Sequence, residues 1–441
     1  MQAMRDTICA LSSGAPPSAL AVIRISGPEV RRLADIHLKS QCPAPRQAIV
    51  TDLLDRNGNA IDHIVVVFMP GPRSFTGDDI LELTVHGSAF IIEETLRTLQ
   101  MSGARLAEPG EFSRRAFEAG KLDLTRAEAI ADLIDTESAA QHKQALLQYN
   151  GALAKIYDDW HQQLTETLAL LEVSIDFPDE HDAPENVDGP ARRALVKLFS
   201  DLEAALADGN VTERIRDGFQ IVILGAPNSG KSTLLNQLSG RDTAIVTDRP
   251  GTTRDILEVR LNLGGYIVRL MDTAGIRETD DEIEAEGVAR AQRAAQEADV
   301  RIWLFDVRDG LNPDYRAEPD DILVANKFDL SPDSVVSRET VRISAKLGEG
   351  VSELVDRITR SISRLGSAAP APVITRLRHR QGIEHAQAFI AKAISGLDDC
   401  AGAEFVAADV RSAARALGGL TGAVDTEEIL GAVFSSFCIG K

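Results

Sequence analysis

The 441-residue sequence has few cysteines, no long apolar run and no excess of basic residues. Its four cysteines, Cys9, Cys42, Cys400 and Cys438, are scattered and form no C-x-x-C pair, so neither a disulfide framework nor a thiolate zinc site is indicated. The longest apolar run, residues 64–69, is far shorter than the roughly 20 residues that a membrane-spanning helix needs. No basic segment followed by an apolar one opens the sequence. We therefore expect a cytoplasmic protein with no membrane contact.

Acidic residues outnumber basic ones. The 47 lysines and arginines stand against 67 aspartates and glutamates, which gives a formal net charge of -20. Because phosphate binding depends on Lys and Arg side chains, this charge argues against a surface that coats duplex nucleic acid. Any contact with nucleic acid must be local or supplied by a partner. With 44% hydrophobic and 26% charged residues the composition is typical of a soluble protein.

The pattern along the chain predicts several domains, and the length suits about two to four of them. Residues 1–118 mix short β-rich runs with helical segments, which predicts an α+β domain. Apolar residues recur at helical spacing from residue 123 to about 171, which predicts a helical domain over residues 119–212, and the same periodicity returns in residues 371–441. Residues 213–370 alternate strands with helices, which is typical of a doubly wound parallel sheet. We expect a multidomain α/β protein in which a nucleotide-binding domain is inserted into an all-α helical domain.

A phosphate-binding loop is predicted at GAPNSGKS, residues 225–232. The segment matches G-x-x-x-x-G-K-[ST] and lies between a β-rich run and a helix, which is the context that this loop requires. Its glycines let backbone amides face the phosphates, and the N-terminus of the following helix favours negative charge. Lys231 is expected to reach the β- and γ-phosphates, and the Ser232 hydroxyl to bind Mg²⁺.

Three further motifs complete the predicted nucleotide site, and two of them identify the base as guanine. DTAG at 272–275 follows a strand, so Asp272 emerges at the carboxyl end of the sheet. In NKFD at 326–329, the Asp329 carboxylate can accept both N1–H and the 2-amino group of guanine, and adenine offers neither donor. SAK at 344–346 can supply a backbone amide to the guanine O6. Four motifs in this order predict a Ras-like GTPase domain.

A switch loop is expected at TDRPGTTRD, residues 247–255, which orders around the γ-phosphate. Thr253 is the expected second hydroxyl ligand of Mg²⁺, although a threonine in a loop also commonly caps a turn. The predicted GTP-binding residues are Asn228, Ser229, Gly230, Lys231, Ser232, Thr233, Thr247, Thr252, Thr253, Asp272, Thr273, Ala274, Gly275, Asn326, Lys327, Asp329, Ser344, Ala345 and Lys346.

Asn228 in the phosphate loop, GTTRD in the switch and Ile276 after DTAG resemble the potassium-dependent GTPases that lack a catalytic glutamine. An isoleucine side chain cannot orient water by hydrogen bonding. Segments outside the nucleotide domain narrow the match: VIRISG, FTGDDILELTVHG, GEFSRRAF, KLDLTRAEAIADLID and the terminal FCIGK. Together they make the chain similar, over essentially its whole length, to the MnmE (TrmE) family of tRNA uridine modification GTPases.

The resemblance implies an N-terminal domain that forms a homodimer and binds 5-formyltetrahydrofolate, or a related one-carbon folate, through Arg24, Glu82, Lys121 and the C-terminal Lys441. It also implies a flavoprotein partner, MnmG (GidA), in a heterotetramer-type complex that binds tRNA. Members of the family use this complex to add an aminomethyl-type group to carbon 5 of the wobble uridine. A GTP-dependent switch or assembly factor without one-carbon chemistry is the alternative.

Two catalytic assignments also come from the resemblance. Glu284 corresponds to the acidic residue that positions the attacking water, and Cys438 is either a reactive thiol near the folate or only a reducible surface cysteine.

The chain departs from the family pattern at Phe75, at GDD in place of GED, at Gly87-Ser88, and at Arg249 and Pro250 in the switch loop. The implied K⁺ ligands are Asn228, Thr247, Arg249 and Thr252, and the cation takes the place of an arginine finger.

Overall fold

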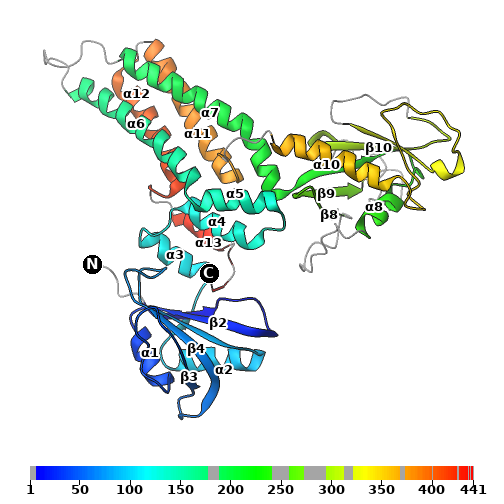
Figure 1. The fold of residues 1–441 in the computed structure, drawn as a ribbon. Coiled ribbons are helices and arrows are strands. Elements are labelled where there is room, and N and C mark those ends of the chain that lie inside the picture. Colours follow the sequence, from blue (N-terminus) through cyan, green and yellow to red (C-terminus); the bar gives the residue numbers. More distant parts are fainter. Residues whose placement is uncertain are drawn as a thin grey trace, which may run out of the picture. The chain divides into compact units, whose positions relative to one another are not determined.

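The structure is a computed structural model of the chain. It describes residues 6–176, 188–240, 258–272, 295–311, 321–367, 373–399, 401–424, 427–435, 437 and 439–440 (Figure 1). The chain divides into two compact units, of which the first joins Met1–Ala131 to Gly418–Lys441 and the second is Asp132–Leu417. The predicted domain boundaries after residues 118, 212 and 370 stay predictions. Among the described residues, no helix is long and apolar enough to cross a membrane.

A six-stranded sheet forms the centre of the first unit. Its strand order is β3-β4-β5-β2-β1-β6, and all neighbours are antiparallel except β1 and β6. The strands are β1 (Ile8–Leu11), β2 (Ser18–Ser26), β3 (Ala48–Leu54), β4 (Ala60–Met69), β5 (Ile80–Gly87) and β6 (Arg105–Leu106). The helices of this part are α1 (Val30–His37), α2 (Ala89–Met101), α3 (Glu111–Glu118) and α4 (Leu124–Asp135).

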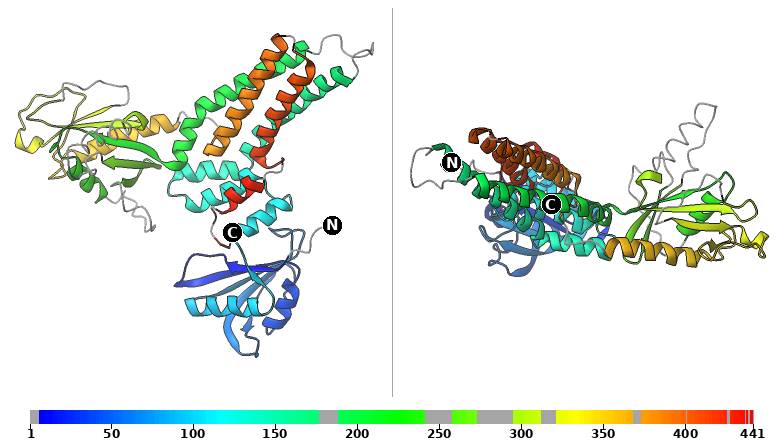
Figure 2. Two further views of the ribbon diagram at one scale, coloured as in Figure 1. Left: turned by 180° about the vertical axis from the view of Figure 1, so that it is seen from behind. Right: turned by 90° about the horizontal axis from the view of Figure 1, so that it is seen from above.

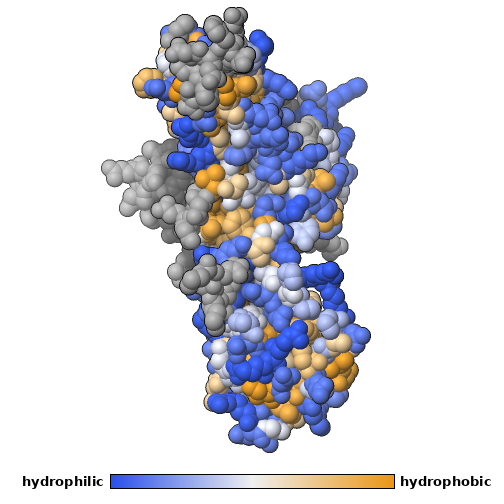
Figure 3. All heavy atoms as spheres, turned by 90° about the vertical axis from the view of Figure 1, so that its left-hand side faces the viewer, coloured by the Kyte–Doolittle hydropathy of each residue, from blue (hydrophilic) through white to orange (hydrophobic). Residues whose placement is uncertain are grey.

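Alternation along the strands gives this sheet two different faces. In β4, Ile64, Val66 and Phe68 are buried in the core with residues of α1 and α2. The neighbouring side chains point the other way, since successive strand residues face opposite sides. Val50 of β3 and Val65 of β4, which are register partners, are exposed on that second face. Figure 3 shows apolar patches among the polar surface of this part of the molecule.

The C-terminal residues belong to the first unit. Helix α13 (Glu427–Ser435) places Phe434 in a small apolar core with Leu124 of α4, and Phe437 joins the same core. Beyond it, Ile439 forms a β-bridge with Pro109, and the Ser12 hydroxyl donates a hydrogen bond to the Gly440 carbonyl at 2.8 Å. Ile439 and Gly440 therefore contact N-terminal residues of the sequence within one unit.

One part of the second unit consists of helices that come from before and after the second sheet in the sequence. They are α5 (Ala139–Tyr149), α6 (Ala152–Asp176), α7 (Asp188–Asp217), α11 (Leu377–Asp398) and α12 (Ala403–Thr421). Helix α7 packs against both α6 and α11, and the views of Figure 2 show these helices running side by side. The buried residues of α7 recur every three or four positions, as at Leu195, Leu198 and Leu202.

A second six-stranded sheet, in the order β12-β11-β10-β7-β9-β8, carries the predicted nucleotide motifs. Its strands are β7 (Phe219–Leu224), β8 (Glu258–Leu263), β9 (Tyr266–Asp272), β10 (Val300–Asp306), β11 (Ile322–Asn326) and β12 (Val341–Arg342). Helices α8 (Lys231–Ser239) and α10 (Val351–Ser367) pack on it, and the short helix η1 spans Phe328–Leu330.

The sheet confirms the predicted fold class, with one difference in detail. All neighbouring strands are parallel except β8 and β9, which pair antiparallel as a hairpin. The two residues of its turn, Gly264 and Gly265, have φ of 60° and 84°. Such tight hairpin turns need left-handed backbone, which glycine adopts without steric cost. The Gly-Gly pair between two β-rich runs was the sequence signal for this hairpin.

Candidate functional site

The phosphate-binding loop lies between the end of β7 and the start of α8. Gly225 has φ 154°, and a Cβ there would lie 2.0 Å from the Leu304 carbonyl oxygen. Gly230 has φ 102°, and its Cβ would lie 2.2 Å from the Asn326 side-chain nitrogen. Both separations are far below van der Waals contact, and φ near 100° is itself unfavourable for residues with a side chain. The two glycines of the motif are therefore required by the packing of this loop.

Lys231 lies folded against the loop. The residue is buried, and its Nζ donates to the carbonyl oxygens of Gly225, at 2.8 Å, and Ala226, at 3.1 Å. Ser232 follows it in the first turn of α8. The ammonium group thus stands at the N-terminus of a helix, where backbone N–H groups and the helix dipole favour an anion. This arrangement suits a phosphate chain.

Asn326 joins three of the motifs. Its side chain is buried, its Nδ2 donates to the Ser229 carbonyl at 2.7 Å, and its Oδ1 accepts a hydrogen bond from the Ala345 amide at 2.9 Å. One amide group therefore fixes the phosphate loop, NKFD and SAK relative to one another. Because the register of parallel strands brings their carboxyl ends to one edge, the segments that follow β7 and β11 meet there.

The guanine side of the site is formed by NKFD and SAK. Asp329 lies in η1 and is exposed, so its carboxylate is accessible to a ligand. Lys327 has φ 61°, and its Nζ donates to the Asn228 carbonyl at 2.7 Å. Ser344 is buried and its amide donates to the Glu349 carbonyl, which closes the SAK turn. Lys346 on this turn is exposed.

Part of the predicted site lies outside the described residues. Asp272 is present as the last residue of β9 and is the register partner of Ile223, beside the strand that leads into the phosphate loop. Thr233 lies in α8, next to Ser232. The predicted residues that fall outside the description are Thr247, Arg249, Thr252, Thr253, Thr273, Ala274, Gly275, Glu284, Cys438 and Lys441.

In the first unit, two of the predicted folate residues are in contact. Arg24 of β2 and Glu82 of β5 are register partners, and both Nε and Nη2 of the arginine approach Glu82 Oε1, at 2.9 and 2.8 Å. The guanidinium carbon lies 5.8 Å from the ring centre of Phe75 and 5.6 Å from that of Phe112. Lys121 Nζ donates to the Pro72 carbonyl. Pro72 and Phe75 belong to the loop between β4 and β5, so Arg24 and Lys121 both contact this loop.

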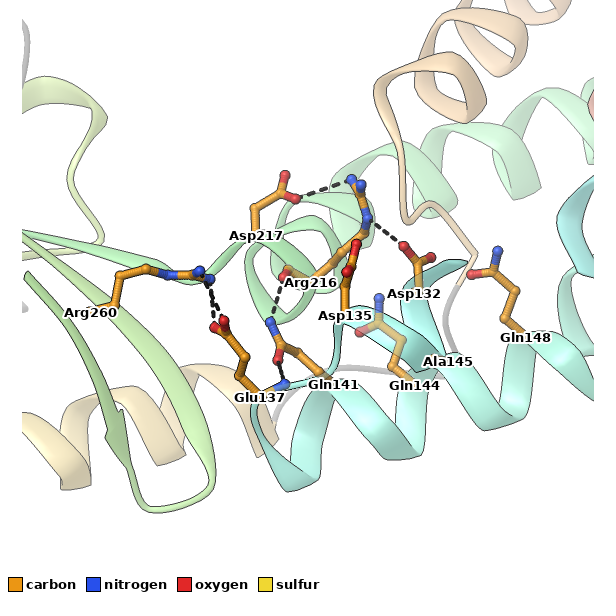
Figure 4. Close-up of a pocket in the computed structure, with 10 residues that line it drawn as sticks. All are labelled: Asp132, Asp135, Glu137, Gln141, Gln144, Ala145, Gln148, Arg216, Asp217 and Arg260. Carbon is orange, nitrogen blue, oxygen red and sulfur yellow. Dashed lines mark hydrogen bonds and ion pairs between the residues drawn. The ribbon is translucent and has the colours of Figure 1, made fainter. Parts of the chain in front are cut away.

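A polar cavity of about 170 Å³ lies in the second unit, beside the β8–β9 hairpin. Arg260 of β8 forms an ion pair with Glu137, at 3.0 Å, just before α5 (Figure 4). Gln141 of α5 donates to the Arg216 carbonyl at 2.7 Å, and Arg216 pairs with Asp132 at 3.2 Å. The hairpin that leads to Asp272 is thus tied to the helical part of its unit. No group of acidic, His or Cys residues within the described part of the chain has the geometry of a metal site.

The fold and the loop geometry define a P-loop protein of the guanine-nucleotide-binding class. The family model described as "MnmE helical domain" matches residues 124–438, and that described as "GTP-binding protein TrmE N-terminus" matches residues 7–121. The chain belongs to the MnmE family of tRNA modification GTPases. This confirms the resemblance found in its motifs.

Relatives match the chain from end to end. A tRNA modification GTPase MnmE of Hyphomonas neptunium is 51% identical over 440 residues and covers 100% of both chains. One of Caulobacter vibrioides is 47% identical, over 99% of this chain and 100% of its own. Among solved structures, a variant of Aquifex aeolicus Era bound to GDP.AlF4- is 29% identical, over 32% of this chain and 56% of its own, with a TM-score of 0.25. The family assignment rests on the sequence relatives.

Proposed function

We propose that this chain hydrolyses GTP to drive a tRNA modification, in which an aminomethyl-type group is added to carbon 5 of the wobble uridine. The observation that carries the proposal is the joining of the phosphate loop, NKFD and SAK through Asn326, in a chain that belongs to the MnmE family over its full length. A flavoprotein partner acts with it, and a formyl-tetrahydrofolate supplies the one-carbon unit. The acidic charge of the chain favours tRNA binding through the complex with that partner.

In the proposed reaction the chain binds and orients GTP before hydrolysis. Lys231 and the amides of the phosphate loop hold the β- and γ-phosphates. The Asp329 carboxylate selects guanine by accepting hydrogen bonds from N1–H and the 2-amino group of the base. Glu284 orients the attacking water through a second water. Since this role matters mainly in the transition state, Glu284→Ala is expected to abolish hydrolysis while GTP binding is retained.

Ser232 would hold Mg²⁺ together with Thr253, and Asn228 would hold K⁺ together with Thr247, Arg249 and Thr252. The described residues fit these roles: Ser232 stands at the start of α8, and Asn228 has φ 64° in the phosphate loop, with its carbonyl held by Lys327. When bound, the two cations offset negative charge on the phosphates. GTP turnover is therefore expected to be faster in KCl than in NaCl, and Asn228→Ala to remove that difference. Equal rates in the two salts for the unmodified chain would refute the potassium site.

The folate is proposed to bind beside Arg24 and Glu82. The Glu82 carboxylate suits the adjacent N–H donors of a pterin, and the partly exposed ring of Phe75 beside Arg24 offers a flat apolar surface. Lys121 and Lys441 would meet the anionic glutamyl tail. The contacts of Phe437, Ile439 and Gly440 with residues of the first unit support a position for the FCIGK segment near this region.

We further propose a homodimer formed by the first unit. The second face of its sheet exposes Val50 and Val65 side by side, which is a surface suited to burial against another chain. The unit would then contribute to the heterotetramer-type complex with the flavoprotein.

The test is nucleoside analysis of tRNA modified by the chain and its flavoprotein partner, run beside a GTP turnover assay. Cys438→Ser replaces the sulfur almost isosterically but cannot supply a thiolate. We expect it to keep GTP binding and hydrolysis and to lose modification. Full modification by this variant would exclude a catalytic thiol.

A GTP-dependent switch without one-carbon chemistry is the competing function, because it would need the same nucleotide site. A titration with 5-formyltetrahydrofolate separates the two. Binding by the unmodified chain that Glu82→Ala abolishes supports the enzyme, and absence of folate binding supports the switch.

A further inference from the structure

Asp306 is the last residue of β10 and belongs to none of the nucleotide motifs. Its side chain is 5% exposed. One carboxylate oxygen, Oδ1, accepts hydrogen bonds from the Arg308 backbone N, at 3.0 Å, and from Arg308 Nε, at 2.9 Å. The other, Oδ2, lies 2.6 Å from Arg308 Nη2 and 3.0 Å from the Nζ of Lys327, the lysine of NKFD. A buried carboxylate thus holds a residue of the guanine site.

The contact continues to the phosphate loop. Lys327 Nζ, besides pairing with Asp306, donates to the Asn228 carbonyl at 2.7 Å. Lys327 and Asn228 have φ of 61° and 64°, in the left-handed region that residues with a side chain rarely adopt. The ammonium group therefore stands between a fixed carboxylate on the sheet and a backbone carbonyl of the loop that holds the phosphates. Hydrogen bonds from Arg308 lower the pKa of Asp306, so the carboxylate is charged at neutral pH.

We propose that Asp306 is a positioning residue for guanine nucleotide, which acts through Lys327 to hold the phosphate loop at Asn228 in its binding conformation. This inference rests on the assignment of GTP to the site. A side chain that is already ordered loses less conformational freedom when the ligand arrives, so the pairing favours affinity without touching the nucleotide. Asp306 therefore affects binding only while Lys327 is present.

The same two strands offer a matched control at their other ends. Arg301, near the start of β10, donates from Nε to Asp321 Oδ1 at 2.7 Å, just before β11 begins. The Asp321 side chain is 3% exposed, so it resembles Asp306 in burial and in having an arginine partner. Arg301 and Asp321 lie at the opposite edge of the sheet from the nucleotide loops. Asp321→Asn removes a comparable carboxylate without touching Lys327.

The experiment uses the full chain and a fluorescent N-methylanthraniloyl GDP, with the dissociation constant and dissociation rate measured for each variant. Asp306→Asn is expected to raise the Kd about tenfold, the effect of losing one charge-assisted hydrogen bond, mainly through faster dissociation. Asp321→Asn is expected to change the Kd by less than about twofold. An unchanged Kd in Asp306→Asn would overturn the proposal.

A double-mutant cycle tests the route through Lys327. In a Lys327→Met background, Asp306→Asn is expected to change the Kd by less than about twofold, because the group it positions has been removed. A tenfold effect in both backgrounds would mean that Asp306 affects binding by stabilising the fold and not through Lys327, and would overturn the proposal. The melting temperature of each nucleotide-free variant is measured in parallel.

Arg308→Ala serves where Asp306→Asn lowers the yield of folded protein. It removes the guanidinium but keeps the hydrogen bond from the backbone N of residue 308 to Asp306 Oδ1, which continues to orient the carboxylate toward Lys327, so the Kd is expected to stay within about twofold of the unmodified chain. A tenfold rise would assign the effect to the Arg308 pair and overturn the proposal. Absence of GDP binding by the unmodified chain would instead refute the nucleotide assignment on which it rests.

Discussion

The nucleotide site and the Arg24–Glu82 region of the first unit are built in different ways. The nucleotide site is a set of short continuous motifs, and much of what they do is done by backbone groups of the phosphate loop and SAK. Arg24 and Glu82 lie 58 positions apart in sequence and meet because β2 and β5 pair in a particular register. A site made of backbone groups leaves a recognisable local pattern, because only certain residues permit the required conformation. A site made of side chains on paired strands leaves no such pattern.

The largest effect is expected at the phosphate loop. Gly230→Ala would place a methyl group 2.2 Å from the Asn326 amide and force an unfavourable φ, which separates the phosphate loop from NKFD. GTP binding should fall by at least about 100-fold, since several hydrogen bonds to the phosphates are lost together. Equilibrium binding of labelled GTP measures it.

Gly240→Ala is the matched control at the other end of α8. Gly240 has φ -81°, and its Cβ would lie 3.6 Å from the Asn236 carbonyl, which is ordinary contact. GTP affinity close to that of the unmodified chain is expected. If both alanine variants bound GTP equally well, the local packing described for Gly230 would not matter for binding.

A smaller effect is expected on the guanine side. Asp329→Asn exchanges a charged acceptor for an amide, and a hydrogen bond to a charged group contributes about 1.5 to 3 kcal/mol, or roughly 10- to 150-fold in affinity. GTP should bind more weakly and xanthosine triphosphate better. Competition between the two nucleotides measures the change. GTP affinity that does not respond to this substitution would remove Asp329 from the guanine site.

In the first unit, Glu82→Gln is expected to weaken 5-formyltetrahydrofolate binding by about tenfold, because one charge-assisted hydrogen bond is lost. GTP affinity should stay unchanged. Isothermal titration with each ligand measures both values. Glu94→Gln, which removes the partner of Arg97 on the exposed surface of α2, is the control and should leave both affinities unaltered. A loss of folate binding in the control alone would contradict the proposed site.

The smallest effect is expected at the hydrogen bond between Ser12 and the Gly440 carbonyl. Ser12→Ala removes the hydrogen bond to the Gly440 carbonyl, which should lower the free energy of unfolding of the first unit by about 0.5 to 1.5 kcal/mol. Ser18→Ala, whose hydroxyl bonds locally to the Leu20 carbonyl, is the control. Thermal denaturation followed by calorimetry compares the two. Equal melting temperatures would mean that the Ser12 contact adds nothing to stability.

Much of the fold was predictable from sequence. Alternating strands and helices predicted the second sheet, and helical spacing predicted helices such as α5 and α6, because burial of one face imposes its period on the sequence. The antiparallel pairing of β8 with β9 was not predicted, although Gly264-Gly265 carried its signal. Asp306 and the Arg260–Glu137 pair were not predicted either, since a lone charged residue in a sequence is usually a solvated one.

The sequence by itself determined the class of nucleotide, because Gly225, Gly230 and Asp329 are set by backbone conformation and base chemistry, which act locally. It also determined the family, through motifs spread along the chain. Only the tertiary structure decided that Asn326 joins three motifs and that Lys327 is held by Asp306. It also decided that Phe437, Ile439 and Gly440 contact residues of the first unit. Those contacts depend on strand register and on packing between distant segments, and each partner is compatible with many others until the chain has folded.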